Sequence, residues 1–272
     1  MPTATDHARA LSARVRAAGL SLPAAAVAYN AFLAMVPLIL ALLGVASIIG
    51  QSAAAVDRVQ RALDPVVPGS VVRFIVDLMR ESAVRVGDSG PLLVVASAVV
   101  ALFLGSRAVV ALQRATAAVD HQAEARQGAS IRITAIALTV AGGLALLVTS
   151  LMLVAGRELF EFLAHLTGFA AFDELWVWLR VPVSAFGLFG FLLAFYHFGP
   201  PKPLAWSWVA ALVATGVAIL GSLGFGLYLA LSPDLGPTFG TLGAVAVALV
   251  WLYVGALAIL LGAVVATYVR DL

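Results

Sequence analysis

Six stretches of this 272-residue chain contain no Asp, Glu, Lys or Arg, and each is close to the length that crosses a lipid bilayer. An α-helix rises about 1.5 Å per residue, so a hydrocarbon core of about 30 Å needs about 20 apolar residues. The stretches are Ala17 to Val56, Ser89 to Ser106, Ile133 to Gly156, Val181 to Pro201, Pro203 to Pro233 and Leu235 to Val269. They predict an all-α, polytopic membrane helix bundle with six transmembrane helices.

The composition favours the same class. Hydrophobic residues make up 62% of the chain and charged residues 11%, whereas soluble domains carry about 25% charged residues. The formal net charge is only +2, so we expect membrane lipids and not nucleic acid as partners. Arg9, Arg14 and Arg16 precede an apolar run that is too long for a cleavable signal peptide, so this run is interpreted as a retained first span.

Helix-breaking residues and charges set the expected span limits within one domain of residues 1–272. The spans are placed at about 24–49, 91–104, 133–155, 181–198, 204–231 and 242–268. Pro37 removes a hydrogen bond in the middle of the first span and is the predicted hinge. The helix of the second span is expected to continue past the lipid to Asp120. The side that holds both termini carries nine basic residues, among them Arg132, against four acids, whereas the other side carries seven against ten. This balance places both termini in the cytoplasm.

The loop of residues 51–88 is the longest predicted extramembrane segment and lies on the outer side. Its second half carries an apolar helical face and an opposite charged face. The apolar face holds Val72, Ile75, Val76, Met79 and Ala83, and the charged face holds Arg73, Asp77, Arg80 and Glu81. This pattern predicts an amphipathic helical hairpin. It either packs on the other helices or lies on the membrane surface, where an envelope protein partner would bind.

Polar side chains near the spans are the candidate site residues. Arg107 and Arg114 lie at i and i+7, with Gln113 adjacent, near the cytoplasmic end of the second span. They are either positive-inside anchors or a substrate-binding site for an anionic head group. A second set is expected to line the interior, either as contacts between helices or as substrate contacts: Tyr29, Asn30, Tyr196 and His197.

Small residues recur at four-residue spacing in the last two spans. They are Ala218, Ser222 and Gly226, then Ala258, Gly262 and Ala266. Such faces let helix backbones approach closely, so helix packing is expected over a pore lining. A homo-oligomer is a further candidate assembly.

The residues give little support to an enzyme. No Asp or Glu lies inside a predicted span, and the four His have no metal-ligand spacing. A G-x-x-x-x-G-K-[ST] nucleotide loop is also missing from the sequence. A dyad of Ser222 and His197 would place its two members toward opposite sides of the membrane. The sequence therefore predicts no catalytic residue, no metal and no cofactor.

Three segments together resemble the YihY/BrkB family of bacterial envelope proteins. They are AAAVAYNAF at 24–32 with Pro37, then GSRAVVALQR at 105–114, and finally FGTLGA at 239–244 with VWLY at 250–253 and LLGA at 260–263. The resemblance implies a six-helix protein of the bacterial cytoplasmic (inner) membrane with a cytoplasmic N-terminus. It also implies a role in envelope integrity or lipid movement. Some members have carried a ribonuclease BN label, which the residues here do not support. Where the family commonly has an acidic residue, this chain has Val264, Val265 and Ala266.

Together these features predict a transporter-like protein that moves or partitions lipid or another amphipathic substrate at the cytoplasmic membrane. The alternative is a non-transporting scaffold for envelope machinery. A transporter is expected to have a polar cavity between the first, second and fourth spans, whereas a scaffold is expected to have a solid core.

Overall fold

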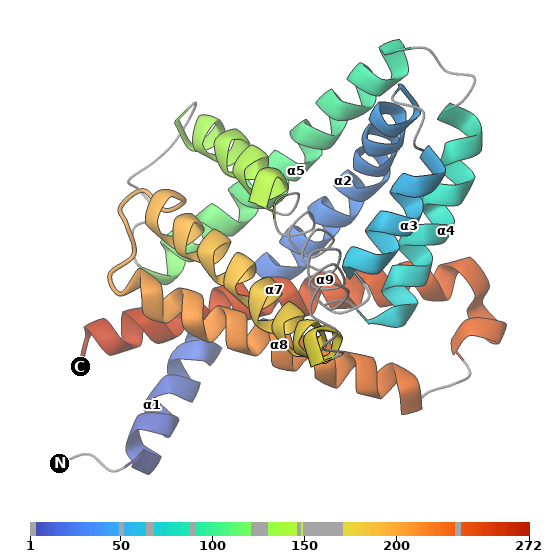
Figure 1. The fold of residues 1–272 in the computed structure, drawn as a ribbon. Helices are drawn as coiled ribbons and strands as arrows, with labels where there is room; N and C mark the ends of the chain where they lie inside the picture. The colour runs from blue at the N-terminus through green and yellow to red at the C-terminus, as the bar shows by residue number, and fades with distance from the viewer. Residues whose placement is uncertain are drawn as a thin grey trace.

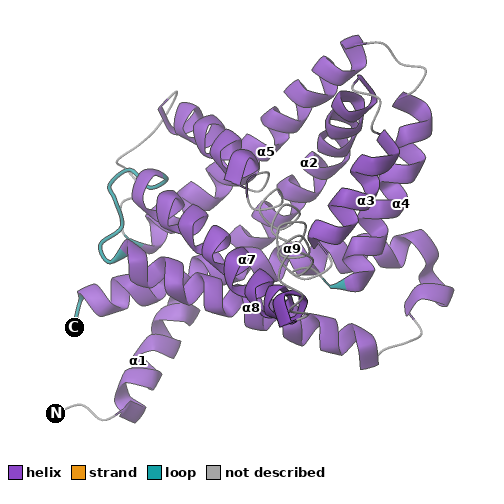
Figure 2. Ribbon diagram, in the orientation of Figure 1, coloured by secondary structure: helices purple, strands orange, loops and turns teal. Residues whose placement is uncertain are grey.

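The computed structural model describes residues 4–48, 52–63, 68–86, 91–120, 130–145, 148, 171–231 and 235–272. These parts of the chain form helices joined by short turns, with no strand among them (Figure 2). The labelled helices are α1 (Ala4–Ala17), α2 (Ser21–Ile48), α3 (Ser52–Leu63), α4 (Gly69–Val86), α5 (Pro91–Val119), α7 (Ala171–Phe198), α8 (Ser207–Leu231) and α9 (Leu235–Arg270). The prediction of an all-α membrane helix bundle is confirmed.

Five of the described helices are long and apolar enough to cross a membrane. Their apolar segments are Ser21–Leu43, Val94–Val119, Val181–Phe198, Ser207–Leu231 and Gly243–Arg270. They lie where the first, second, fourth, fifth and sixth spans are predicted. In place of the third span, the structure describes a shorter apolar helix, Ser130–Ala145. Apart from residue 148, the rest of the predicted segment 133–155 lies outside the described residues, so the count of six is approximate.

Helix α2 occupies the middle of the arrangement and packs against α5, α9 and α4 (Figure 1). Helix α8 packs along α9 and α7. Pro37 lies inside α2, which is helical on both sides of it, and its role as a hinge stays a prediction. Helix α5 continues to Val119 as one element, so its apolar segment is longer than the predicted span of 91–104.

The predicted amphipathic hairpin is formed by α3 and α4, and its apolar face packs on the bundle. A buried cluster joins it to α2 and α9: Ile39, Leu43, Val56, Val71, Val72, Val76, Met79 and Ala248. The charged side chains of Arg73, Asp77, Arg80 and Glu81 are exposed on the other face. The side chain of Ala83 lies outside the described residues. The hairpin therefore covers the end of the bundle opposite the termini.

Helix α1 is an amphipathic element that the pattern of uncharged stretches does not indicate. Leu11, Val15 and Ala18 pack against the main core, which includes residues of α2, α5, α7, α8 and α9. The chain then turns at Gly19, whose φ of +56° favours glycine. The turn lets α1 lie beside the C-terminal end of α9, so the two ends of the chain meet in one region (Figure 1).

Small residues bring α8 and α9 into close contact. Ala258 and Ala266 are fully buried, and a Cβ added at Gly262 would lie 2.5 Å from the Ala210 carbonyl oxygen. Trp251 Nε1 of α9 donates a hydrogen bond of 3.1 Å to Ser222 Oγ of α8. These contacts support helix packing as the role of the small-residue faces.

Candidate functional site

Exposed arginines mark one face of α5. Arg107 and Arg114 both point away from the bundle, and their i and i+7 spacing puts them on the same side of the helix. They belong to the apolar segment Val94–Val119. Gln113, which was grouped with them from the sequence, is fully buried. The structure therefore keeps the two arginines together and turns Gln113 to the interior.

A third arginine joins this face from the neighbouring helix. The Arg132 guanidinium lies over the Phe103 ring, 4.8 Å from its centroid, and Phe103 precedes Arg107 by one turn on the same face. A Cβ added at Gly105 would lie 3.1 Å from Thr139 Cγ2, so the two helices approach closely here. We call Phe103, Arg107, Arg114 and Arg132 the basic face of α5. From the sequence alone, Arg132 was only one of the positive charges that orient the protein.

The opposite face of α5 carries buried polar groups. Gln113 and Thr116 are fully buried, and Asp120 is 6% exposed. The amide atoms of Gln113 and the hydroxyl of Thr116 have no hydrogen-bond partner among the described residues. The positions i, i+3 and i+7 put the three side chains on one line along the helix. Polar side chains are therefore buried on this part of α5 next to Leu112 and Ala115 of the apolar core.

The structure places Tyr29 and Asn30 differently from the expected interior lining. The Tyr29 side chain is 59% exposed. Asn30 Nδ2 donates a hydrogen bond of 2.7 Å to the carbonyl of Ala26, one turn earlier in the same helix. An amide that bonds to its own helix needs no partner across the bundle. Tyr29 is therefore exposed, and Asn30 is half-buried with its amide bonded within α2.

Tyr196 lies in the core, whereas His197 is exposed. The Tyr196 side chain is fully buried, and its hydroxyl donates a hydrogen bond of 2.5 Å to the carbonyl of Ile259 in α9. The adjacent His197 points outward and contacts Phe198 edge-on, with 4.7 Å between ring centroids. Tyr196 therefore joins α7 to α9, and His197 faces the surroundings of the bundle.

Replacing Tyr196 with Phe is expected to lower the free energy of unfolding by about 1 kcal/mol, because it removes one buried hydrogen bond and keeps the ring. Thermal unfolding in detergent measures the loss. Tyr29→Phe is the matched control and is expected to leave the midpoint unchanged, because that side chain is 59% exposed. Equal shifts for the two variants would contradict a structural role for the Tyr196 hydroxyl.

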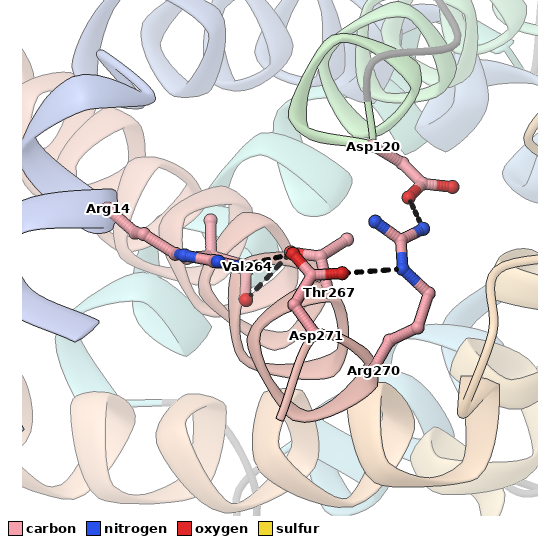
Figure 3. A network of polar contacts seen from close by, with 6 residues as sticks. All are labelled: Arg14, Asp120, Val264, Thr267, Arg270 and Asp271. Carbon is pink, nitrogen blue, oxygen red and sulfur yellow. Dashed lines mark hydrogen bonds and ion pairs between the residues drawn. The ribbon is translucent and has the colours of Figure 1, made fainter. Parts of the chain in front are cut away.

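The two ends of the chain meet in a network of ion pairs (Figure 3). Asp271 accepts hydrogen bonds from Arg14 at 2.8 Å and from Arg270 at 3.0 Å. Arg270 also pairs with Asp120 at the end of α5. The donors of Arg270 and Arg14 hold the pKa of Asp271 below its ordinary value. Beside them, His7 Nδ1 and the Tyr268 hydroxyl are 2.7 Å apart. The network ties α1 and α5 to the end of α9.

A cavity of about 380 Å³ lies next to this network, between α1, α5 and α9. The transport path expected from the sequence was instead between the first, second and fourth spans. Among the residues that the structure describes, no three His, Cys, Asp or Glu side chains group as a metal site requires. The basic face of α5 and this cavity are therefore the two candidate sites among the described residues.

Comparison with known proteins identifies the family. The family model "Virulence factor BrkB" matches residues 11–271. A relative from Bacillus subtilis, called a putative ribonuclease-like protein YfkH, is 29% identical over 167 residues, which cover 60% of this chain and 61% of that protein. A UPF0761 membrane protein from Delftia acidovorans is 31% identical over 128 residues, which cover 46% of this chain and 28% of that protein. Each match thus spans less than two thirds of the relative's own length.

No solved structure matches the chain. The family match covers nearly the whole sequence, and the five apolar helices agree with the membrane protein named among the relatives. This chain therefore belongs to the virulence factor BrkB family of membrane proteins.

Proposed function

We propose that the protein is a transporter-like protein of the bacterial cytoplasmic membrane that moves or partitions lipid, with both termini in the cytoplasm. The single observation that carries the proposal is the basic face of α5. Arg107 and Arg114 are exposed on an apolar helix, and Arg132 is stacked on Phe103 beside them. In this proposal the guanidinium groups hold the phosphate of a lipid head group.

The chemistry of the basic face fits a phosphate group. A guanidinium presents a planar set of donors that matches phosphate oxygens. A charged side chain at the bilayer centre costs about 2.5–3.5 kcal/mol on insertion scales, so exposed arginines on an apolar helix are stabilised by an anionic partner. Arg114 and Arg107 lie about 8 Å and about 18 Å along the helix from Val119. The two guanidinium groups would bind a head group at two successive positions, which lie at different depths in the membrane.

A scaffold for envelope machinery is the second candidate, and one observation favours it. The described cavity lies between α1, α5 and α9, while α2 packs along α5 where a transport path was expected. In that case the exposed charged face of α4 is the surface for a protein partner. Neither candidate assigns a catalytic residue, and the ribonuclease-like name describes the relative from Bacillus subtilis.

Lipid transfer between leaflets tests the proposal. The protein is reconstituted into vesicles, and labelled phospholipid is followed from one leaflet to the other. The double variant Arg107→Gln/Arg114→Gln is expected to lower the rate several-fold. The control is Arg73→Gln/Arg80→Gln, which removes two exposed charges from α4 and is expected to keep the wild-type rate. Equal rates for both variants would exclude the head-group role of Arg107 and Arg114.

The same vesicles separate the two candidate functions. A transporter moves labelled lipid faster than protein-free vesicles do. If vesicles with the wild-type protein transfer lipid no faster than protein-free vesicles, the transport proposal is contradicted and the scaffold is the remaining candidate function.

A further inference from the structure

The cavity beside the termini differs in chemistry from the basic face of α5. It is lined by Arg14, Arg270 and Asp271, by Thr267 and by small apolar side chains. Its volume of about 380 Å³ lies within the range of small-molecule sites, about 300–1,000 Å³. Neither Arg107 nor Arg114 is among the lining residues. It is therefore a separate candidate site, formed by α1, α5 and α9.

Charges of both signs face this cavity. Arg14 and Arg270 contribute guanidinium groups, and Asp271 contributes a carboxylate that bridges them (Figure 3). Asp120 pairs with Arg270 from the α5 side. These four side chains carry two positive and two negative charges in all. A purely anionic ligand at the two arginines would be repelled by the neighbouring Asp271 carboxylate. The lining therefore favours a ligand that carries both a negative and a positive charge.

The donors of Arg14 suit a phosphate group. A guanidinium has five N–H donors, and the bond from Arg14 to Asp271 uses Nη1. The Arg14 and Asp271 side chains are 42% and 40% exposed, so their ion pair is screened by water and readily exchanged for a stronger partner. Bidentate contact with phosphate oxygens is such a partner. Asp271 then remains beside Arg270 to accept a hydrogen bond from a ligand ammonium.

The remaining wall is apolar. Ala17, Ala18, Ala118, Val119 and Val264 present only methyl groups and backbone to the cavity. Thr267 Oγ1 donates a hydrogen bond of 2.9 Å to the Val264 carbonyl, so its oxygen can still accept one. The cavity lies where the apolar segment of α9 ends at Arg270, a level at which lipid head groups meet the protein. A glycerol unit and the first carbons of its chains would contact the apolar wall.

We propose that the cavity between α1, α5 and α9 binds the head group of a zwitterionic phospholipid of the phosphoethanolamine type. The phosphate contacts Arg14 and Arg270, and the ammonium contacts Asp271. This goes beyond the proposed function by assigning a second lipid site, and it rests on that function for the choice of a lipid. Binding here is separable from transfer along the basic face, because the two places share no residue.

Binding of short-chain lipids to the purified full-length protein in detergent tests the proposal. Isothermal titration calorimetry compares dihexanoyl phosphatidylethanolamine, dihexanoyl phosphatidylglycerol and free phosphoethanolamine. The ethanolamine lipid is expected to bind about tenfold more tightly than the glycerol lipid, since only it carries an ammonium for Asp271 (a factor of ten is about 1.4 kcal/mol). It is also expected to bind more tightly than free phosphoethanolamine, which lacks the apolar contacts.

Three variants assign the contacts. Arg14→Gln is expected to weaken the binding of both lipids about tenfold. Asp271→Asn is expected to remove the preference for ethanolamine and to keep binding of the glycerol lipid, an outcome that a misfolded protein would not give. Arg16→Gln is the control, because Arg16 is exposed on α1 and does not line the cavity. It is expected to bind both lipids as the wild type does.

Several outcomes would overturn the assignment. Equal affinity of the wild type for the two lipids would exclude a zwitterionic site. An unchanged preference in Asp271→Asn would exclude the ammonium contact, and equal affinity for free phosphoethanolamine would exclude a lipid as the ligand. The Arg107→Gln/Arg114→Gln variant is expected to keep this binding. If it does so while wild-type protein transfers no lipid in vesicles, the transport proposal fails and the binding site stands.

Discussion

Replacing Gly262 with alanine is expected to destabilise the bundle by about 2–3 kcal/mol, because the extra methyl group has no space where α7, α8 and α9 meet. A Cβ at this position would lie 2.5 Å from the Ala210 carbonyl oxygen, 2.7 Å from Tyr196 Oη and 2.9 Å from Ala214 Cβ. The nearest of these atoms belongs to a helix backbone, which cannot rotate away as a flexible side chain can. The helices must therefore separate to accept the substitution.

The matched control lies two turns earlier in the same helix. Gly255 is also inside α9, but a Cβ added there meets no atom within 4 Å. Gly255→Ala is expected to leave stability unchanged or to raise it slightly, because alanine favours the helix by about 1 kcal/mol over glycine. Thermal unfolding of the two variants in detergent separates the effects, with a drop of several degrees expected for Gly262→Ala alone. Equal midpoints would contradict the tight contact.

Features that depend on one segment and its period could be predicted from the sequence. The uncharged stretches indicated membrane helices because crossing a bilayer needs a fixed apolar length. The apolar face of α4 indicated an amphipathic hairpin because Val72, Val76 and Met79 repeat at helical spacing. Packing on the bundle was one of its two predicted positions, and all three side chains are buried. The small residues around Gly262 indicated close helix packing for the same reason.

Features that depend on which face of a helix turns inward could not be predicted. Helix α2 is apolar on nearly all sides, so its sequence does not indicate whether the Tyr29 side chain points inward or outward. In the structure it is 59% exposed. On α5, Gln113 and Arg114 are neighbours in sequence, yet one is buried and the other exposed. In lipid the outer surface of a helix is as apolar as its packed surface, so hydrophobic periodicity gives little information about burial.

Contacts between segments that are far apart in the chain could not be predicted from the sequence either. The network at the termini brings Arg14 of α1 and Asp120 of α5 to the last residues of α9. Each of these residues alone indicated only a charge outside the membrane. Their pairing depends on α1 folding back at Gly19 and on α5 and α9 ending at the same level, which no local pattern specifies.

Replacing Arg270 with methionine is expected to lower the free energy of unfolding by about 2 kcal/mol. The substitution keeps an unbranched apolar stem but removes the guanidinium, whose charge pairs with Asp120. The Asp120 side chain is 2% exposed, whereas that of Arg270 is 37% exposed. Removing one partner of a fully buried ion pair costs about 3–5 kcal/mol, and water around Arg270 reduces that value here.

Arg14→Met is the control for this prediction. It removes the exposed pair with Asp271 and the stacking of the guanidinium over the Tyr268 ring, but no contact with Asp120, and it is expected to shift the unfolding midpoint little. A double-mutant cycle then isolates the buried pair. In an Asp120→Asn background the carboxylate charge is already gone, so Arg270→Met is expected to cost much less than in the wild type. Equal costs in the two backgrounds would show that Arg270 stabilises the bundle by packing and by its exposed pair with Asp271, and not through Asp120. A large difference would mean that α5 and α9 are held together at this end by the ion pair, which also positions Arg270 in the wall of the cavity.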